Sequence, residues 1–334
     1  MTTTIIALPL LFALIALALA FDFLNGLHDA ANSIATVVST RLLSPVQAVL
    51  FAAFFNFAAY FVFGLKVAET IGKGIIDKDI VNPQVIFGAL VGAMFWNVVT
   101  WWKGIPSSSS HALVGGLIGA GTARAGLDGI VWSGVAKTAS AIVVSPVTGL
   151  ILSMLLMLAT AWIFMRATAG RAEGVFKKLH LFSAAAYSLG HGANDAQKTM
   201  GLITVLLYSQ GMLGGEFHVP GWVVLSCYIA IGLGTLSGGW KIIETMGTRI
   251  TKLSHQQGFC ASAGGSVMLF AASAFGIPVS TTHTITGCVV GVGAARRASA
   301  VRWSVAGRVV VAWLITIPAS AIVGAIFYWL VALL

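Results

Sequence analysis

Gly190-His191-Gly192-Ala193-Asn194-Asp195-Ala196-Gln197-Lys198-Thr199 is a polar stretch inside an apolar sequence. An earlier stretch, Asn25-Gly26-Leu27-His28-Asp29-Ala30-Ala31-Asn32-Ser33, resembles it when Asp29 is aligned with Asp195, at an offset of 166 residues. Polar side chains then fall at matching positions, which are 25, 28, 29, 32 and 33 in the first copy and 191, 194, 195, 198 and 199 in the second. Residues at this spacing share one face of a helix. Each copy therefore predicts a helix with a polar stripe.

The composition places these stripes in a membrane. Of the 334 residues, 58% are hydrophobic and 9% are charged, whereas a soluble domain has about 25% charged residues. Apolar stretches of about 20 residues, enough to cross a hydrocarbon core of roughly 30 Å, recur along the chain. Asp22, Asp29 and Asp195 are the acidic residues inside those stretches, and intramembrane carboxylates are functional candidates by default. The sequence predicts an all-α polytopic protein of the plasma membrane, surrounded by lipid.

The basic residues predict the orientation of the chain. The net charge of +9 is spread over short loops, without the block of like charges typical of a nucleic-acid-binding tail, so nucleic acid is not an expected partner. Cytoplasmic loops are enriched in Lys and Arg. Placing Arg41 and the stretches 166–178, 241–257 and 296–302 inside gives 11 basic residues there and five outside. Both termini then lie outside.

The chain divides into two similar membrane halves, 1–165 and 179–334, joined by a short cytosolic connector at 166–178. The first apolar run, 5–43, would reach about 58 Å as one helix, so we expect a break near Asn25-Gly26. About 10–12 membrane helical segments are expected in all, and 66–83 reads as a loop with a short amphipathic helix. The other expected apolar segments are 45–64, 85–102, 112–121, 138–164, 179–207, 219–239, 259–275 and 305–333.

A second pair of motifs repeats at an offset of 172 residues. Gly104-Ile105-Pro106-Ser107-Ser108-Ser109-Ser110-His111 matches Gly276-Ile277-Pro278-Val279-Ser280-Thr281-Thr282-His283 at Gly, Ile, Pro, one Ser and His. The loop charges require 83–123 to enter and leave the membrane from outside and 257–295 from inside. These segments are therefore predicted re-entrant hairpins of two inverted-topology repeats, an architecture that transporters build around a central site.

The hairpin motifs predict an anion site. Pro106 and Pro278 suit the first turn of a helix, and the neighbouring hydroxyl groups can cap free N–H groups. Each tip should therefore begin a half-helix whose positive end points to the membrane centre, where hydroxyl and N–H donors suit a tetrahedral oxyanion. The alternative is that these hydroxyl groups only let helices pack closely. The candidate substrate ligands are Ser107, Ser108, Ser109, Ser110, His111, Ser280, Thr281, Thr282, His283, Asn194 and Lys198.

The carboxylates predict a coupled cation, because a multiply charged anion needs cations in a low-dielectric site. The candidate cation-coupling residues are Asn25, Asp29, Asn32, Ser33, Asp195 and Thr199. Lys198 replaces the Asn32 of the first copy, so an ammonium group stands where a second Na⁺ site would need an oxygen. This replacement favours H⁺ over Na⁺. The alternative is that Lys198 only neutralises Asp195.

Neither a cofactor nor a structural metal site is expected. His28, His111, His191 and His283 are single histidines in apolar surroundings, and we interpret His111 and His283 as hydrogen-bonding or proton-handling groups. The three cysteines lack the paired spacing of a metal or disulfide framework and are interpreted as packing residues.

These motifs resemble those of the inorganic phosphate transporter (PiT) family, closest to its bacterial low-affinity phosphate permeases. The resemblance rests on Gly-Ala-Asn-Asp at 192–195, His-Asp-Ala-Ala-Asn-Ser at 28–33 and the paired Gly-Ile-Pro motifs, and it covers both halves. It implies symport of inorganic phosphate with Na⁺ or H⁺, or transport as a neutral metal-phosphate complex, by a helical protein often found as a homodimer. It also implies that Asp29, Asn32, Ser33, Asn194 and Asp195 line the substrate and cation sites. The short connector and Gln197-Lys198 depart from the symmetric family pattern.

Three other functions are alternatives for such a sequence. A sulfate permease would share the fold, although a site for sulfate needs donors only, whereas monohydrogen phosphate, like its analogue arsenate, also needs an acceptor such as Asp29 or Asp195. An intramembrane hydrolase built from His28, Asp29 and buried serines would have no reason to duplicate its catalytic groups. A purely structural subunit would not retain buried carboxylates. Oxyanion transport, without an enzymatic reaction, is therefore the expected function.

Overall fold

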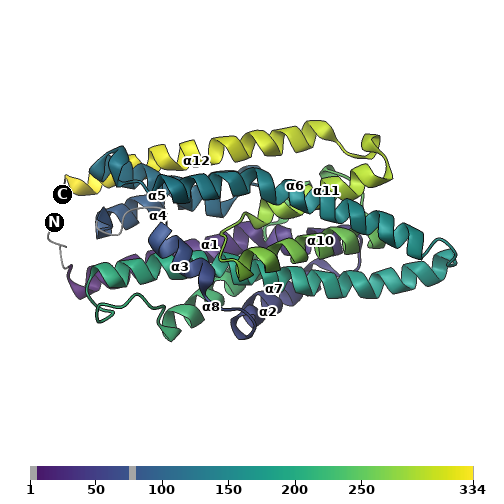
Figure 1. The fold of residues 1–334 in the computed structure, drawn as a ribbon, viewed down its shortest axis with the longest axis horizontal. Coiled ribbons are helices and arrows are strands. Elements are labelled where there is room, and N and C mark those ends of the chain that lie inside the picture. The colour runs from purple at the N-terminus through teal and green to yellow at the C-terminus, as the bar shows by residue number, and fades with distance from the viewer. Residues whose placement is uncertain (1–5, 75–79, 334) are drawn as a thin grey trace.

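The structure, a computed structural model, describes residues 6–74 and 80–333. The described chain is helical, as predicted, and its helices form one elongated bundle (Figure 1). The parts of the predicted segments that fall on residues 1–5, 75–79 and 334 lie outside the described residues. The elements are α1 (Leu8–Ser39), α2 (Pro45–Ala58), η1 (Ala59–Phe61), α3 (Lys66–Gly74), α4 (Pro83–Lys103), α5 (Ser109–Ala125), η3 (Leu127–Gly129), α6 (Trp132–Ile163), α7 (Ala169–Ser209), α8 (Gly221–Ser237), α9 (Trp240–Glu244), η4 (Thr245–Arg249), α10 (His255–Ala274), α11 (Thr281–Arg296), η5 (Ala298–Ala300) and α12 (Trp303–Ala332).

The helix α1 is continuous over 32 residues, so the predicted break near Asn25-Gly26 is wrong. Gly26 serves helix packing instead, because a Cβ atom there would lie 2.2 Å from the carbonyl oxygen of Ile231 on α8. Its counterpart Gly192 has the same role, with a Cβ position 2.3 Å from the carbonyl oxygen of Asn56 on α2. The long helices α1 and α7, which carry the polar stripes, therefore each approach a helix of the other half closely.

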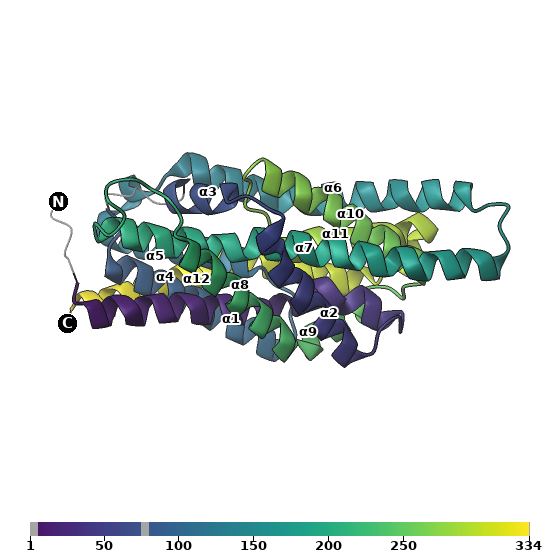
Figure 2. The ribbon, with the colours of Figure 1, turned by 90° about the horizontal axis from the view of Figure 1, so that it is seen from below.

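The two hairpins, α4–α5 and α10–α11, lie toward opposite ends of the bundle (Figure 1). Capping groups start their first arms at equivalent positions, since Asn82 accepts the N–H of Val85 and Ser254 accepts that of Gln257. The start of α1 and the end of α12 lie at one end of the bundle, and the α6–α7 connection lies at the other (Figures 1 and 2). This arrangement is the one that an inverted repeat predicts.

The halves exchange partners throughout the bundle. The helix α1 packs on α8 and α7 packs on α2, while α5 packs on α12 and α11 on α6. The same exchange fixes the hairpin turns: Lys241 and Thr245 donate to carbonyl oxygens of Trp102 and Gly104. In the reverse direction, the equivalent residues Lys66 and Thr70 donate to Ala274 and Gly276. The halves therefore hold each other's hairpins in place.

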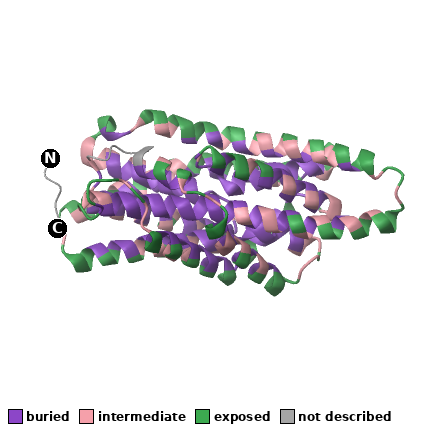
Figure 3. Ribbon diagram, turned by 60° about the horizontal axis from the view of Figure 1, so that its bottom comes forward, coloured by how far each residue is buried: buried purple, intermediate pink, exposed green. Residues whose placement is uncertain are grey.

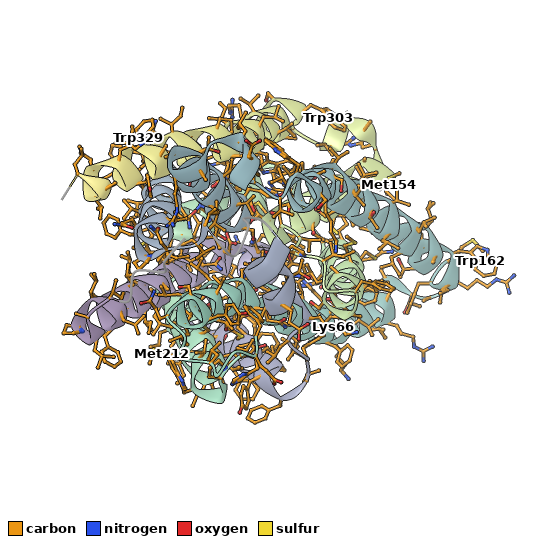
Figure 4. All side chains as sticks on the ribbon, turned by 60° about the vertical axis from the view of Figure 1, so that its left-hand side comes forward. Lys66, Met154, Trp162, Met212, Trp303 and Trp329 are labelled. Carbon is orange, nitrogen blue, oxygen red and sulfur yellow. The ribbon has the colours of Figure 1, made fainter. Side chains whose placement is uncertain are left out.

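Many large hydrophobic side chains are exposed on the exterior of the bundle. The buried residues gather in the central helices (Figure 3). Trp303 and Trp329 lie near opposite ends of α12, and Trp162 lies at the far end of α6 (Figure 4). These rings are 56%, 56% and 76% exposed. Exposed Trp at helix ends is typical of the two membrane interfaces, which fits a bundle surrounded by lipid.

Four described helices are long and apolar enough to cross a membrane: α1, α4, α6 and α12. The bent pairs α2–α3 and α8–α9, with bends of 86° and 69°, raise the count among described residues to at most six. The half-helices α5 and α11 do not meet this criterion because they have 17 and 16 residues, and α7 does not because polar residues interrupt its apolar sequence.

Candidate functional site

Asp29 and Asp195 face each other in the centre of the bundle, as the repeat predicts. Asp29 lies on α1 and Asp195 on α7, and their side chains are 2% and 0% exposed. One oxygen of each carboxylate and a ring nitrogen of His191 all lie within 4.8 Å of one another. Two carboxylates at this distance repel each other strongly unless cations lie beside them. The site is therefore built to bind positive charge.

Each hairpin tip begins a half-helix at this point. Both tips turn at a glycine in the left-handed region, Gly104 with φ 65° and Gly276 with φ 64°, which other residues adopt only with strain. The helices α5 and α11 then start behind Ser108 and Ser280, whose hydroxyl groups accept the N–H groups of His111 and His283. The predicted half-helices are confirmed.

Pro106 and Pro278 lie two residues before these caps, so their predicted place in the first helical turn is wrong. The serine caps set the helix starts, because their side chains satisfy N–H groups that a proline cannot. The residues from Pro106 to the cap are non-helical. They bring the chain back to the centre of the bundle, where the first helical hydroxyl groups meet the carboxylates.

The next hydroxyl groups along each tip donate to the carboxylates. Ser109 donates to Asp29 Oδ2 at 3.0 Å and to Asn25 Oδ1 at 2.6 Å. Thr281, the equivalent of Ser109, donates to Asp195 Oδ2 at 2.9 Å, and Thr282 donates to Asp29 Oδ1 at 3.3 Å. Each carboxylate therefore contacts a hairpin tip, and the same hydroxyl groups are the donors that an oxyanion would use.

Asn32 and Lys198 occupy equivalent places in the two halves. The amide of Asn32 donates to Thr281 and Thr282 at 3.2 and 2.9 Å. The ammonium group of Lys198 contacts Asp195 and Ser110, the equivalent of Thr282, and donates to the carbonyl oxygen of Val279 at 2.8 Å. An amide and an ammonium group therefore span the same gap between a long helix and the opposite tip.

Two histidines that were not predicted to belong to the site support the carboxylates. His28 Nδ1 lies 2.8 Å from Asp29 Oδ1, and its Nε2 lies 3.0 Å from Thr100 Oγ1. His191 Nε2 lies 3.1 Å from Asp195 Oδ2, and its Nδ1 lies 3.1 Å from Asn56 Oδ1. Their signal in the sequence was their position, one and four residues before an intramembrane aspartate.

Other predicted residues lie around this centre. The rings of His111 and His283 are 4.6 Å apart between centroids, and His283 also stacks on Trp313 at 3.8 Å. Ser107 donates to Thr100 instead of facing the carboxylates. Asn194 binds the backbone of its hairpin, donating to the carbonyl oxygen of Ile277 and accepting the N–H of Val279. Its amide therefore positions the tip.

Three further residues carry buried hydroxyl groups. The hydroxyl groups of Ser33 and Thr199 are buried without a hydrogen-bond partner among the described residues. Tyr187, which the sequence analysis did not single out, donates its hydroxyl to the carbonyl oxygen of Thr281 at 2.8 Å. This bond fixes the start of α11 beside Asp195. It joins segments 94 residues apart, so no local pattern could have indicated it.

A buried site of opposed carboxylates and helix N-termini, held between two hairpins of a lipid-facing bundle, is the architecture of a secondary transporter. Comparison with known sequences identifies the family of transporters to which the chain belongs. The profile of the phosphate transporter family matches residues 25–324. The chain belongs to the phosphate transporter family, which comprises membrane permeases and not enzymes.

Several relatives cover nearly the whole chain. A "Probable low-affinity inorganic phosphate transporter" of Rhizobium meliloti (strain 1021) is 64% identical over 324 residues, covering 97% of each chain. One of Bacillus subtilis (strain 168) is 41% identical and covers 97% of this chain and 98% of its own. A solved structure named "The sodium-dependent phosphate transporter" aligns with a TM-score of 0.86 at 28% identity, covering 98% of this chain and all of the other.

Proposed function

We propose that this protein imports inorganic phosphate across the plasma membrane by symport with a cation, and that the cation is H⁺ in preference to Na⁺. The observation that carries this choice is the position of Lys198. Its ammonium group contacts Asp195 and Ser110, in the place that the amide of Asn32 occupies in the other half. A fixed positive charge there stands in for one metal ion and repels another.

The charges of the site require a mobile cation as well. Asp29 and Asp195 contribute two negative charges and Lys198 one positive charge, all with side chains at most 2% exposed. Bringing a dianion into this low-dielectric site adds two more negative charges, which is prohibitive without compensation. Binding of H⁺, or transfer of phosphate as a neutral complex with a divalent metal ion, lowers this cost.

Phosphate is favoured over sulfate by the acceptors in the site. A protonated phosphate oxygen needs an acceptor, and Asp29 and Asp195 lie directly beside the hydroxyl donors of the tips. Sulfate carries no proton near neutral pH, so each carboxylate would oppose one of its oxygens. Leaving such a pair unsatisfied costs roughly 3 kcal/mol, or about a hundredfold in affinity.

Uptake of labelled phosphate into vesicles that contain the purified protein tests the coupling. Replacing external Na⁺ with choline at constant pH should leave most of the uptake intact, whereas collapsing an inward proton gradient should remove phosphate accumulation. The solved relative named as sodium-dependent makes Na⁺ the second candidate. Loss of uptake in choline, with accumulation driven by a Na⁺ gradient alone, would reverse the assignment.

Competition in the same vesicles tests the anion. Arsenate has the protonation pattern of phosphate and should compete with it, whereas an excess of sulfate should not. Asp29→Asn and Asp195→Asn should each abolish uptake while the proteins still insert and elute as single species. Strong competition by sulfate would favour a sulfate permease, and full transport by both variants would remove the carboxylates from the mechanism.

A further inference from the structure

Asp22 is a third carboxyl group in the core of the bundle. It lies on α1, seven residues before Asp29 and therefore on the same face of the helix. Its side chain is fully buried, and both of its oxygens are without a hydrogen-bond partner among the described residues. The side chains of Thr199, Asn25 and Cys227 lie next to it. The hydroxyl groups of Thr199 and Tyr228 also have no hydrogen-bond partner in the described part of the chain.

Asp22 differs from the two central carboxylates in its charge environment. Asp29 lies beside His28, and Asp195 lies beside Lys198 and His191. In the described part of the chain, no Lys, Arg or His forms an ion pair with Asp22. An ionised carboxylate that is buried without a cation is very costly. Asp22 must therefore bind a cation of its own whenever it is shielded from water.

The titratable groups that face Asp22 are neutral when protonated and negatively charged when deprotonated. They are Cys227 and Tyr228 on α8 and Asp195 on α7, with Asp29 farther along its own helix. None of them supplies the missing positive charge. Each one that ionises makes an ionised Asp22 less favourable still.

The neighbours of Asp22 suit a proton better than a metal ion. A hard cation needs several oxygen ligands, and a thiol such as that of Cys227 is a soft ligand that Na⁺ does not favour. Asn25 is also engaged, because its Oδ1 accepts the Ser109 hydroxyl at 2.6 Å. A proton needs only the carboxyl group itself, and the hydroxyl groups of Thr199 and Tyr228 can accept a hydrogen bond from it.

Asp22 is linked to the central site through two of its neighbours. Asn25 accepts the same Ser109 hydroxyl that donates to Asp29. Thr199 lies one turn after Asp195 on α7 and directly follows Lys198. The second half has no equivalent carboxyl group, since Ser188 takes this position and donates to the carbonyl oxygen of Ala184. The bundle therefore has one such group, beside one face of the site.

We propose that Asp22 is the residue that carries the coupled proton. This inference rests on the proposed proton symport. The Asp22 carboxylate takes up a proton from the side on which phosphate enters, keeps it as a neutral carboxyl group while the site is closed, and releases it on the other side. One O–H bond forms and the same bond breaks, so the cycle moves one proton without any other reaction.

The experiment compares accumulation with exchange in vesicles that contain purified wild type, Asp22→Asn or Asp22→Glu, with the membrane potential clamped at zero. Asn mimics a permanently neutral carboxyl group. With an inward gradient of one pH unit, one coupled proton supports about tenfold accumulation of phosphate. Wild type and Asp22→Glu should accumulate phosphate, and a pH dye should report entry of protons with it. Asp22→Asn should show neither effect and should keep the exchange of internal for external phosphate.

Matched variants separate the outcomes. Ser188→Ala, at the equivalent position, should accumulate phosphate like wild type, and Asp29→Asn should lose exchange as well. Infrared spectra should show the C=O band of a protonated carboxyl group that disappears in Asp22→Asn and persists in Asp29→Asn. Accumulation by Asp22→Asn, loss of exchange in a well-folded Asp22→Asn, or a wild-type spectrum without this band would overturn the inference. If wild type itself shows no proton-driven accumulation, the proposed symport fails and Asp22 is not the cause.

Discussion

The two halves of the central site share a frame but differ in charge. The frame is duplicated: Gly26 and Gly192 allow close helix contacts, and Ser108 and Ser280 cap the half-helices. The charges are not duplicated, because the position of the Asn32 amide in the first half is taken by the ammonium group of Lys198 in the second. Backbone geometry therefore sets the symmetry of this protein. Single side chains on that backbone decide which ions it can bind.

The histidines show the same separation of frame and chemistry. Each carboxylate has one imidazole within 3.1 Å, but His28 adjoins Asp29 in sequence, whereas His191 lies one helical turn before Asp195. The second ring nitrogens then bind different partners, Thr100 and Asn56. The two carboxylates therefore receive similar support through different contacts.

Restoring the symmetry at Lys198 should have the largest effect. Lys198→Asn gives the second half the residue of the first and removes one partner of a buried ion pair, which costs about 3–5 kcal/mol of folding free energy. We expect phosphate uptake to become dependent on Na⁺, because an amide oxygen and the freed carboxylate of Asp195 can bind it. Uptake in Na⁺ and in choline measures the change, and thermal unfolding in both salts measures the stability.

Lys198→Met is the matched control, since it removes the charge without adding an oxygen. It should be destabilised in both salts and should transport poorly in either. Equal stimulation of both variants by Na⁺ would show that the amide oxygen is not a ligand. Uptake by Lys198→Asn that remains independent of Na⁺ would show that Lys198 does not determine the coupled ion.

Local features of the fold could be predicted from the sequence. The half-helices at Ser109 and Thr281 were predictable because hydroxyl caps act within a few residues, although the predicted place of the prolines was wrong. The proximity of Asp29 and Asp195 followed from the repeat. The continuity of α1 was not predictable, because Gly26 resembles a helix break until the carbonyl oxygen of Ile231 is seen against it.

Contacts between distant segments limited the prediction of the site. The bond from Tyr187 to the carbonyl oxygen of Thr281 and the contact of His28 with Thr100 join different helices. Asp22 was visible as an intramembrane acid, but only the structure shows that no described residue gives it the basic partner that Asp29 and Asp195 have. Patterns along one helix do not contain this information.

Adding a methyl group at the paired glycines tests whether the halves are equivalent in packing. Gly26→Ala and Gly192→Ala would place Cβ atoms 2.2 and 2.3 Å from carbonyl oxygens of Ile231 and Asn56. Overpacking of this kind costs about 1–3 kcal/mol, so both variants should unfold at lower temperature by similar amounts. Gly192→Ala should lose more uptake, because Asn56 binds His191 at 3.1 Å.

Gly174→Ala is the control for these variants, since its Cβ position on α7 meets no atom of the described residues within 4 Å. It should leave uptake unchanged and raise the unfolding temperature slightly, because Ala favours a helix over Gly by about 1 kcal/mol. Equal uptake by the Gly26→Ala and Gly192→Ala variants would contradict the role of Asn56. Unequal loss of stability would contradict the packing symmetry.

The smallest effects are expected at the hydroxyl groups that hold the hairpin turns. Thr245 donates to the carbonyl oxygen of Gly104 at 3.0 Å, and Thr70 donates to that of Gly276 at 2.8 Å. Valine keeps the shape and removes the donor, so each substitution should cost about 1 kcal/mol. Thr245→Val should cost more than Thr70→Val, because Thr245 is buried and water cannot replace its bond as it can at half-buried Thr70. Thermal unfolding of both variants measures the difference, and a larger loss for Thr70→Val would mean that the two hairpins are not held in the same way.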